Sequence, residues 1–301
     1  MNGDPEELIG TFGLISLVLL AVLAVVVPLQ ANRSDSPQLQ LLARWLRWLF
    51  FATFFAFGLS YFGISERPYW IHWLTGVALW FLLETGFSWL AIRALSYSDH
   101  PLFPVFRENH DGDEWPAENR HIAIRDALRN LGFQRFGALK CMIMEGVYLR
   151  VSVYRDPSCL FNVQLYFVPS PTGSVHLAYA IDSKAADGSR LITDNLGIPF
   201  GGYYPNNWLL ERRPLVTSLK RLLSIHQKRM VQSGREWVPM GENLLESMNA
   251  QQHELERYNF ERGFLVPGSM REEAGKISKE GRYRIWKEKW LMDYFGRASA
   301  A

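Results

Sequence analysis

The sequence predicts an α-helical membrane part with three transmembrane helices, followed by a soluble α+β domain that has a four- or five-stranded antiparallel meander and C-terminal helices. Three long apolar runs fall within residues 1–95, and hydrophobic residues beyond residue 132 alternate as they do in strands. The mean hydropathy of -0.07 hides this division, because it averages a membrane part with a water-soluble part.

Changes in composition along the chain predict its domain organisation. The expected parts are a transmembrane region over residues 1–95, a connector over 96–117, a soluble α+β domain over 118–235 and a C-terminal helical extension over 236–301.

The three membrane helices are expected at about residues 8–30, 46–65 and 69–92. The first contains the 23 uncharged residues Leu8–Gln30, which form about 34 Å of helix and can cross a ~30 Å hydrocarbon core. A cleaved signal peptide is the alternative, but the preceding residues are acidic and no small-residue cleavage site follows. The short turn 65–68 makes the second and third helices an antiparallel hairpin.

Basic residues in the short loops predict the orientation in the membrane. No Lys or Arg precedes the first helix, whereas Arg33, Arg44 and Arg47 lie between the first and second predicted helices. Because basic loops stay in the cytoplasm, the N-terminus is expected outside and the soluble domain inside. Two cysteines, Cys141 and Cys159, without metal-ligand spacing fit a reducing compartment.

Glu84 lies inside the third predicted helix, where an ionisable group must face protein or water. Trp70, Trp73, Val77 and Trp80 fall on the same helix face, which can meet another helix or a separate subunit. One interpretation is a neutral Glu that is hydrogen-bonded between helices, and the other is a proton relay or ligand contact. The expected partners within the chain carry hydroxyl groups: Thr11, Ser16, Thr53, Ser60 and Tyr61.

The soluble part alternates between helical and strand periodicity, with turn residues at the boundaries. Strands are expected over residues 133–141, 147–154, 160–167, 175–181 and 189–193. Helices are expected over residues 118–131, 215–232, 242–262 and 272–295.

One group of polar and aromatic residues could form a ligand site. It consists of His226, Arg229, Asp194, Tyr203 and Tyr204. A histidine on an apolar helix face is by default a satisfied core residue, and the aromatic loop around Tyr203 can pack over the sheet instead of binding a ligand. The sequence shows no catalytic motif.

No metal ion, cofactor or nucleic acid is expected. The acidic turn that contains His110, Asp111, Asp113, Glu114 and His121 matches neither a calcium loop nor a zinc site. A net charge of +2 over 301 residues does not indicate nucleic-acid binding.

The final predicted helix combines aromatic and basic side chains. Trp286 and Trp290 are candidate interface residues together with Trp70, Trp73 and Trp80, and residues 272–297 could contact anionic lipid. Packing against the soluble domain is the alternative, since acidic residues dilute the positive face.

Three motifs lie in the soluble part: Leu131-Gly132-Phe133, the segment 187–195 that reads D-G-x-x-[LI]-x-T-x-N, and an H-x-x-R pair at His226 and Arg229. They resemble bacterial membrane-anchored proteins of unknown function over about residues 120–235. The resemblance implies a bacterial inner (cytoplasmic) membrane protein and brings no activity with it.

These observations favour a membrane-anchored, non-catalytic binding or assembly subunit of a larger inner-membrane complex, with the lipid bilayer and other membrane proteins as partners. The alternative is an enzyme or sensor for a small cytoplasmic or lipid ligand that uses the soluble domain.

Overall fold

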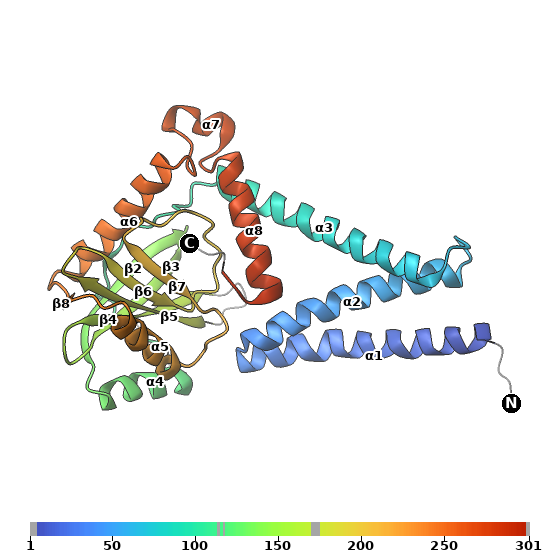
Figure 1. The fold of residues 1–301 in the computed structure, drawn as a ribbon, viewed down its shortest axis with the longest axis horizontal. Helices are drawn as coiled ribbons and strands as arrows, with labels where there is room; N and C mark the ends of the chain where they lie inside the picture. Colours follow the sequence, from blue (N-terminus) through green and yellow to red (C-terminus); the bar gives the residue numbers. More distant parts are fainter. Residues whose placement is uncertain (1–4, 113–114, 117, 170–174, 299–301) are drawn as a thin grey trace. The chain divides into compact units, whose positions relative to one another are not determined.

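The computed structural model describes residues 5–112, 115–116, 118–169 and 175–298. The chain divides into two compact units. The membrane unit comprises residues 1–93 and 290–296, and the soluble unit comprises residues 94–289 and 297–301. Figure 1 shows the fold, coloured along the sequence.

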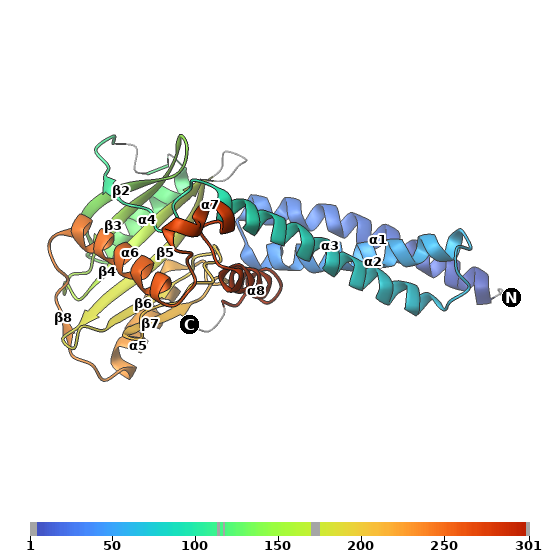
Figure 2. The same cartoon turned by 90° about the horizontal axis from the view of Figure 1, so that it is seen from above.

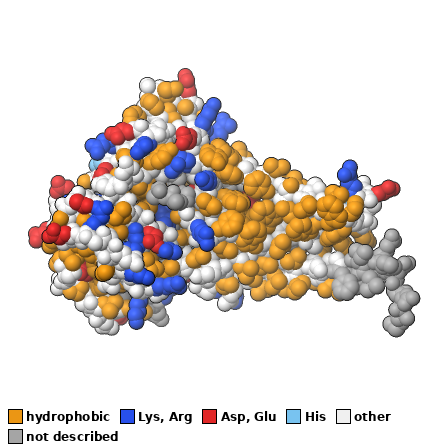
Figure 3. All heavy atoms as spheres, in the orientation of Figure 1, with side chains coloured by type: hydrophobic (Ala, Val, Ile, Leu, Met, Phe, Trp, Pro, Cys, Tyr) orange, Lys and Arg blue, Asp and Glu red, His pale blue; other side chains and the backbone are white. Residues whose placement is uncertain are grey.

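Three helices are long and apolar enough to cross a membrane, which confirms the predicted membrane part. Helix α1 covers Pro5–Ser34, α2 covers Pro37–Tyr61 and α3 covers Tyr69–Tyr97. Their candidate spans are Gly13–Ser34, Pro37–Tyr61 and Tyr69–Tyr97. Hydrophobic side chains gather over these helices in Figure 3, as lipid contact requires.

Helix α2 begins nine residues earlier than the sequence pattern suggests. Pro37 occupies its first turn and the Ser36 side chain accepts from the backbone N–H of Leu39, which is a favourable helix start. Arg44 and Arg47 therefore lie within the helix and not in a loop. Long basic side chains tolerate this position because they can extend toward the headgroups.

Helices α2 and α3 approach closely at small residues. A side chain added at Gly76 would lie 2.9 Å from Cα of Ala52, and Ala52 and Ala56 are fully buried. The indole N–H of Trp48 donates to the backbone carbonyl of Val77 at 3.0 Å. Small residues permit such contact between membrane helices, where packing replaces the hydrophobic effect as the driving force.

The soluble unit contains an eight-stranded, mostly antiparallel sheet. Its strands are β1 (Arg107–Glu108), β2 (Gln134–Met144), β3 (Val147–Arg155), β4 (Phe161–Pro169), β5 (Val175–Ala185), β6 (Arg190–Asp194), β7 (Trp208–Arg212) and β8 (Trp237–Val238). They follow in spatial order from β1 to β7, with β8 paired to β5.

The predicted meander is confirmed as β2–β6, and three strands that the sequence pattern did not reveal extend the sheet. Strands β1 and β8 have two residues each, too few to show any periodicity. Strand β7 is parallel to β6 and returns through residues 195–207, a connection of the length that a parallel pairing needs.

Six helical elements accompany the sheet in the described part of the soluble unit. They are α4 (Asn119–Asn130), α5 (Leu219–Gln232), α6 (Leu244–Glu261), the 3-10 turn Gly268–Met270, α7 (Arg271–Ala274) and α8 (Lys279–Phe295), whose last residues belong to the membrane unit. The single helix expected over residues 272–295 is wrong, because Gly275 adopts a φ of 74° and ends α7.

The two faces of the sheet carry different cores. On one face, Val163, Leu165 and Ile181 pack with Leu128 of α4 and Leu222 of α5. On the other face, Leu139, Cys141, Val151 and Val153 pack with Met248 of α6. Figure 2 gives a second view of the same elements. Successive residues along a single strand therefore face opposite sides of the sheet and meet different helices.

Replacement of Gly76 by Ala is expected to destabilise the α2–α3 hairpin by about 1–3 kcal/mol, since the new methyl group would collide with backbone atoms of Ala52. The measurement is thermal unfolding of the full chain in detergent micelles. Gly86→Ala is the matched control, because an added side chain there meets nothing within 4 Å on the same helix. Equal melting temperatures for both variants would contradict the close approach.

Candidate functional site

His226 of helix α5 lies in the core beneath the sheet and is fully buried. Its Nε2 atom is 2.8 Å from Oγ of Ser183 on β5, and its Nδ1 atom is 3.0 Å from Oγ1 of Thr193 on β6. Both ring nitrogens therefore have partners within the protein.

The neighbouring groups determine which ring nitrogen carries the proton. Arg229 donates to Oγ1 of Thr193 at 2.5 Å, and a guanidinium can only donate. The Thr193 hydroxyl can give its own proton to Nδ1 of His226, and this arrangement favours the tautomer in which Nε2 carries the ring proton and donates to Ser183. Ser183 in turn lies 3.6 Å from the Met230 sulfur. A serine that accepts from the imidazole is not activated as a nucleophile by it.

The environment of His226 keeps its ring neutral. Burial, with a smaller contribution from Arg229, lowers the pKa of His226 from 6.5 to about 3. Desolvation penalises the charged imidazolium, and no carboxylate compensates it. This arrangement is that of a core histidine and not of a general base near neutral pH.

Arg229 uses its guanidinium to join strands. It donates to the carbonyl oxygens of Ile192 and Leu209 at 2.7 Å each, and its Nε is 2.8 Å from the Glu211 carboxylate. These contacts link α5 with β6 and β7. All the strong donors of Arg229 are therefore directed to protein groups.

Asp194 does not join His226 and Arg229, although all three belong to the expected cluster. Asp194 follows Thr193 on β6, and successive strand residues point to opposite faces. The structure thus places His226 and Arg229 on the α5 face and Asp194 on the opposite one. The alternation of side chains along a strand is the sequence signal that could have revealed this separation.

A second buried network surrounds Arg212 of β7. Arg212 pairs with Asp194 at 2.8 Å and with Glu288 of α8 at 3.4 Å, and it donates to the Tyr204 hydroxyl at 3.2 Å. Burial raises the pKa of both carboxyl groups, and Arg212 opposes that rise. Burial likewise raises the pKa of Tyr204 to about 12. The sequence pattern did not single out Arg212 or Glu288, because their pairing joins distant parts of the chain.

The aromatic loop over residues 197–208 packs inside the soluble unit. Gly201, with a φ of 68°, donates its N–H to Glu288, and an added side chain there would lie 2.5 Å from the backbone N of Ile285. Asn259 of α6 bonds both the N–H and the carbonyl of Tyr203, at 2.7 and 2.8 Å. The Tyr203 ring lies under the Arg284 guanidinium at 3.9 Å. The loop thus attaches α6 and α8 to each other.

Glu84 has charged and phenolic partners in place of the expected hydroxyl groups of α1 and α2. The Tyr294 hydroxyl, near the end of α8, donates to its carboxylate. Arg44 lies 3.7 Å from Glu84 and 3.0 Å from Asp293. All four residues belong to the membrane unit.

The expected hydroxyl partners are engaged elsewhere or lie outside the cluster. Ser60 is 3.3 Å from the ring of His72, and Tyr61 is 72% exposed. The side chain of Thr11 lies outside the described residues. Arg44 is the eighth residue of α2, and its long side chain can extend toward the headgroups, which lowers the cost of a charge beside Glu84.

Aromatic rings surround the Glu84 cluster. Trp45 donates its indole N–H to the Tyr294 carbonyl at 2.9 Å, and both Trp45 and Trp48 make edge contacts with the Tyr294 ring, at 5.3 and 5.1 Å. Trp290 contacts Phe81 at 6.4 Å. These rings form an aromatic belt around the Glu84 cluster.

The expected interface tryptophans have different surroundings. Trp80 contacts Phe51 at 5.0 Å, and Trp290 belongs to the aromatic belt. Trp286 contacts Tyr283 at 5.7 Å. Trp73 is half-buried, whereas Trp70 is 61% exposed. Among these five, Trp70 presents the largest free surface to lipid or to another protein.

The described residues contain no group of three or more His, Cys, Asp or Glu side chains that could hold a metal ion. Asp113 and Glu114 of the acidic turn lie outside the described residues. Asp111 pairs with Lys140 at 2.5 Å. Cys141 is buried, which raises its pKa to about 12 and makes its thiol unreactive.

No protein-family model, no curated protein and no solved structure matches the chain.

The neutral His226 is expected to make stability depend on pH. The unfolded chain binds the proton with a pKa near 6.5 and the folded chain only near 3. Stability is therefore fully present above pH 6.5 and falls as the pH drops toward 3, by at most about 1.4 kcal/mol per pH unit. His226→Gln should flatten this slope in thermal unfolding of the full chain.

His253→Gln is the control, because His253 is exposed on α6. An unchanged slope in the His226 variant, with the control also unchanged, would show that His226 does not carry the pH dependence.

Glu84 and Tyr294 are expected to be energetically coupled. In a double-mutant cycle with Glu84→Leu and Tyr294→Phe, the coupling free energy should be about 1 kcal/mol, because the first change alone leaves the Tyr294 hydroxyl without its acceptor. Glu84→Gln keeps an acceptor oxygen and should cost less. The measurement is the free energy of unfolding in mixed micelles.

Tyr283→Phe provides the matched control, since Tyr283 lies on the same helix α8 and is 50% exposed. Its effect should be additive with Glu84→Leu. Additivity of the Tyr294 pair as well would overturn the coupling.

Proposed function

We propose that this protein is a membrane-anchored, non-catalytic binding or assembly subunit of a larger complex in a bacterial inner membrane. Three membrane helices are compatible with the anchor. The non-catalytic role is supported by the core of the candidate ligand cluster, which is buried and hydrogen-bonded within the protein. His226 is fully buried, and its two ring nitrogens have protein partners.

The alternative, an enzyme or sensor that uses this cluster, needs convergent groups that a ligand can reach. Asp194 and His226 lie on opposite faces of the sheet, and the guanidinium groups of Arg212 and Arg229 are directed to carboxylates and carbonyl oxygens. A buried charge whose donors are satisfied has little capacity left for a ligand. The cluster therefore supports a structural role.

Exposed apolar side chains along α3 support a role in assembly. Trp70, Leu82 and Phe87 are 61%, 63% and 74% exposed. Lipid tails or helices of another subunit can cover such side chains. A tryptophan in this position offers a large rigid surface for a partner.

The proposed orientation places the N-terminus outside and the soluble unit in the cytoplasm. Arg33 lies near the end of α1, and Arg44 and Arg47 lie in the first half of α2. The basic residues are therefore nearer to the end where α1 and α2 are joined, and basic residues remain on the cytoplasmic side. The free cysteines Cys141 and Cys159 agree with a reducing compartment.

A photo-reactive phenylalanine analogue at Trp70 or at Phe87 tests the assembly role in native membranes. Both positions are expected to cross-link to one defined membrane protein, which should also copurify in stoichiometric amount on a native gel after mild detergent extraction. The same analogue at Trp80, which packs on Phe51, should give no intermolecular product. Cross-links to lipid alone, with a monomer or homo-oligomer on the gel, would remove the proposal.

A further inference from the structure

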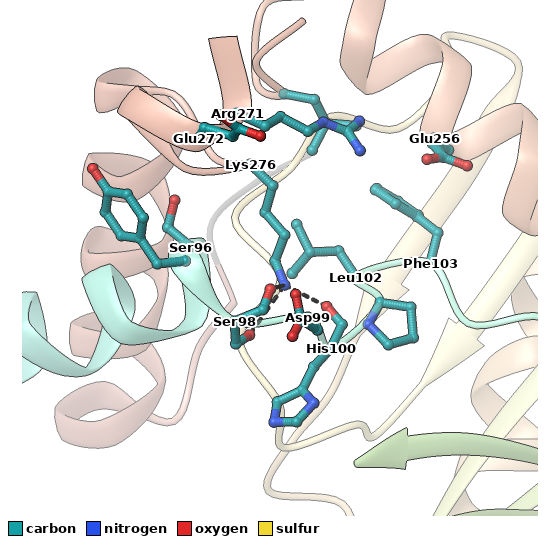
Figure 4. Close-up of a pocket in the computed structure, with 13 residues that line it drawn as sticks. Ser96, Ser98, Asp99, His100, Leu102, Phe103, Glu256, Arg271, Glu272 and Lys276 are labelled. Atoms are coloured by element: carbon teal, nitrogen blue, oxygen red, sulfur yellow. Dashed lines mark hydrogen bonds between the residues drawn. The ribbon is translucent and has the colours of Figure 1, made fainter. Parts of the chain in front are cut away.

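A cavity of about 530 Å³ opens in the soluble unit where the chain leaves helix α3. One wall is the segment 96–103, and the others come from α6, from Leu265 and from the segment 271–276. Leu265 and Phe103 form an apolar floor, while charged side chains surround the opening. Figure 4 shows the side chains that line the cavity.

Chain continuity places this cavity at the membrane surface. Helix α3 has 29 residues and is therefore about 43 Å long, longer than a ~30 Å hydrocarbon core and close to the thickness of a bilayer with its headgroups. Its first turn carries Trp70 and Trp73, which are typical of an interface. Ser96 and Tyr97, the first residues of the cavity wall, then fall within the opposite headgroup layer.

The wall of the cavity is preformed. The Lys276 ammonium donates to the carbonyl oxygen of Ser98 at 2.8 Å, to the Ser98 hydroxyl at 3.1 Å and to the carbonyl oxygen of His100. The backbone N–H of Lys276 also donates to the carbonyl oxygen of Ser96 at 2.8 Å. All three ammonium contacts of Lys276 are therefore made to the connector segment, and they fix its conformation. The dashed lines in Figure 4 mark these hydrogen bonds.

Arg271 and Glu256 are two of the charged residues that line the cavity, together with Asp99 and Glu272. Arg271 donates only its Nε, to the carbonyl oxygen of Val266 at 3.3 Å. Within the described residues, the two Nη atoms of Arg271 and the carboxylate of Glu256 have no hydrogen-bond or ion-pair partner. In Figure 4 the Arg271 side chain extends across the cavity on the side where Glu256 stands. A cation and an anion beside one cavity complement a ligand that carries both charges.

We propose that this cavity binds the headgroup of a zwitterionic phospholipid that has a phosphate and a primary ammonium. The phosphate accepts from the free Nη atoms of Arg271, and the ammonium donates to the Glu256 carboxylate. A phosphatidylethanolamine headgroup has this chemistry. A choline headgroup lacks N–H donors for Glu256, and a phosphatidylglycerol headgroup lacks the cation. The apolar floor at Phe103 receives the glycerol end of the lipid.

Native mass spectrometry of the full chain tests this site. The protein is released from nanodiscs that contain equal amounts of phosphatidylethanolamine, phosphatidylcholine and phosphatidylglycerol, and the lipids that remain bound are counted. One phosphatidylethanolamine should be retained in preference to the other two. Arg271→Gln should lower retention of all three lipids, and Glu256→Gln should lower that of phosphatidylethanolamine alone, by about tenfold for each lost charge-assisted contact.

Arg257→Gln and Glu261→Gln are the matched controls, because both residues lie on α6, are mostly exposed and do not line the cavity. Soluble glycerophosphoethanolamine serves as competitor. If it displaces the lipid at low concentration, the site recognises the free headgroup and not the membrane lipid. Equal retention of all three lipids, or unchanged retention in the Arg271 and Glu256 variants, would overturn the proposal.

Discussion

The buried guanidinium of Arg212 connects most parts of the soluble unit. Its pairs with Asp194 on β6 and Glu288 on α8 bring strand β7, the aromatic loop and the last helix to one point. A buried ion pair of this kind stabilises little by itself, since desolvation of the charges offsets their attraction. The loss of one partner would nevertheless leave an uncompensated charge in the core, so the arrangement of these elements is strongly specified.

The same reasoning explains why the polar core does not form a reaction centre. The Ser183 hydroxyl lies 2.8 Å from a histidine, a distance at which serine nucleophiles are found, yet the imidazole is fully buried. The contacts of Thr193 with Arg229 and with Nδ1 of His226 also favour the tautomer in which Nε2 carries the proton. Proximity of catalytic residue types is therefore insufficient without access and without a free lone pair on the base.

In the membrane unit, the carboxylate of Glu84 is another ionisable group that needs partners. A carboxylate inside a membrane helix requires compensation, and the chain supplies it from two directions: Arg44 from α2 and Tyr294 from the end of α8. The rings of Trp45 and Trp48 pack against Tyr294 beside these charged atoms. The last turns of α8 thereby become part of the membrane unit, although the hydropathy of α8 does not suggest a membrane segment.

Local sequence alone determined the three membrane helices and the meander β2–β6, because hydropathy and residue periodicity act between neighbours in the chain. The local sequence also indicates that Asp194 and His226 lie on opposite faces of the sheet, since Thr193, which contacts His226, and Asp194 are consecutive in one strand. Only the tertiary structure decided the short strands β1 and β8, the parallel strand β7 and the break at Gly275. It also decided the partners of Glu84 and Arg212. Tyr294 is 210 residues from Glu84, and Glu288 is 76 residues from Arg212. Pairings over such distances leave no periodic signal, because they depend on how complete elements pack and which charges that packing buries.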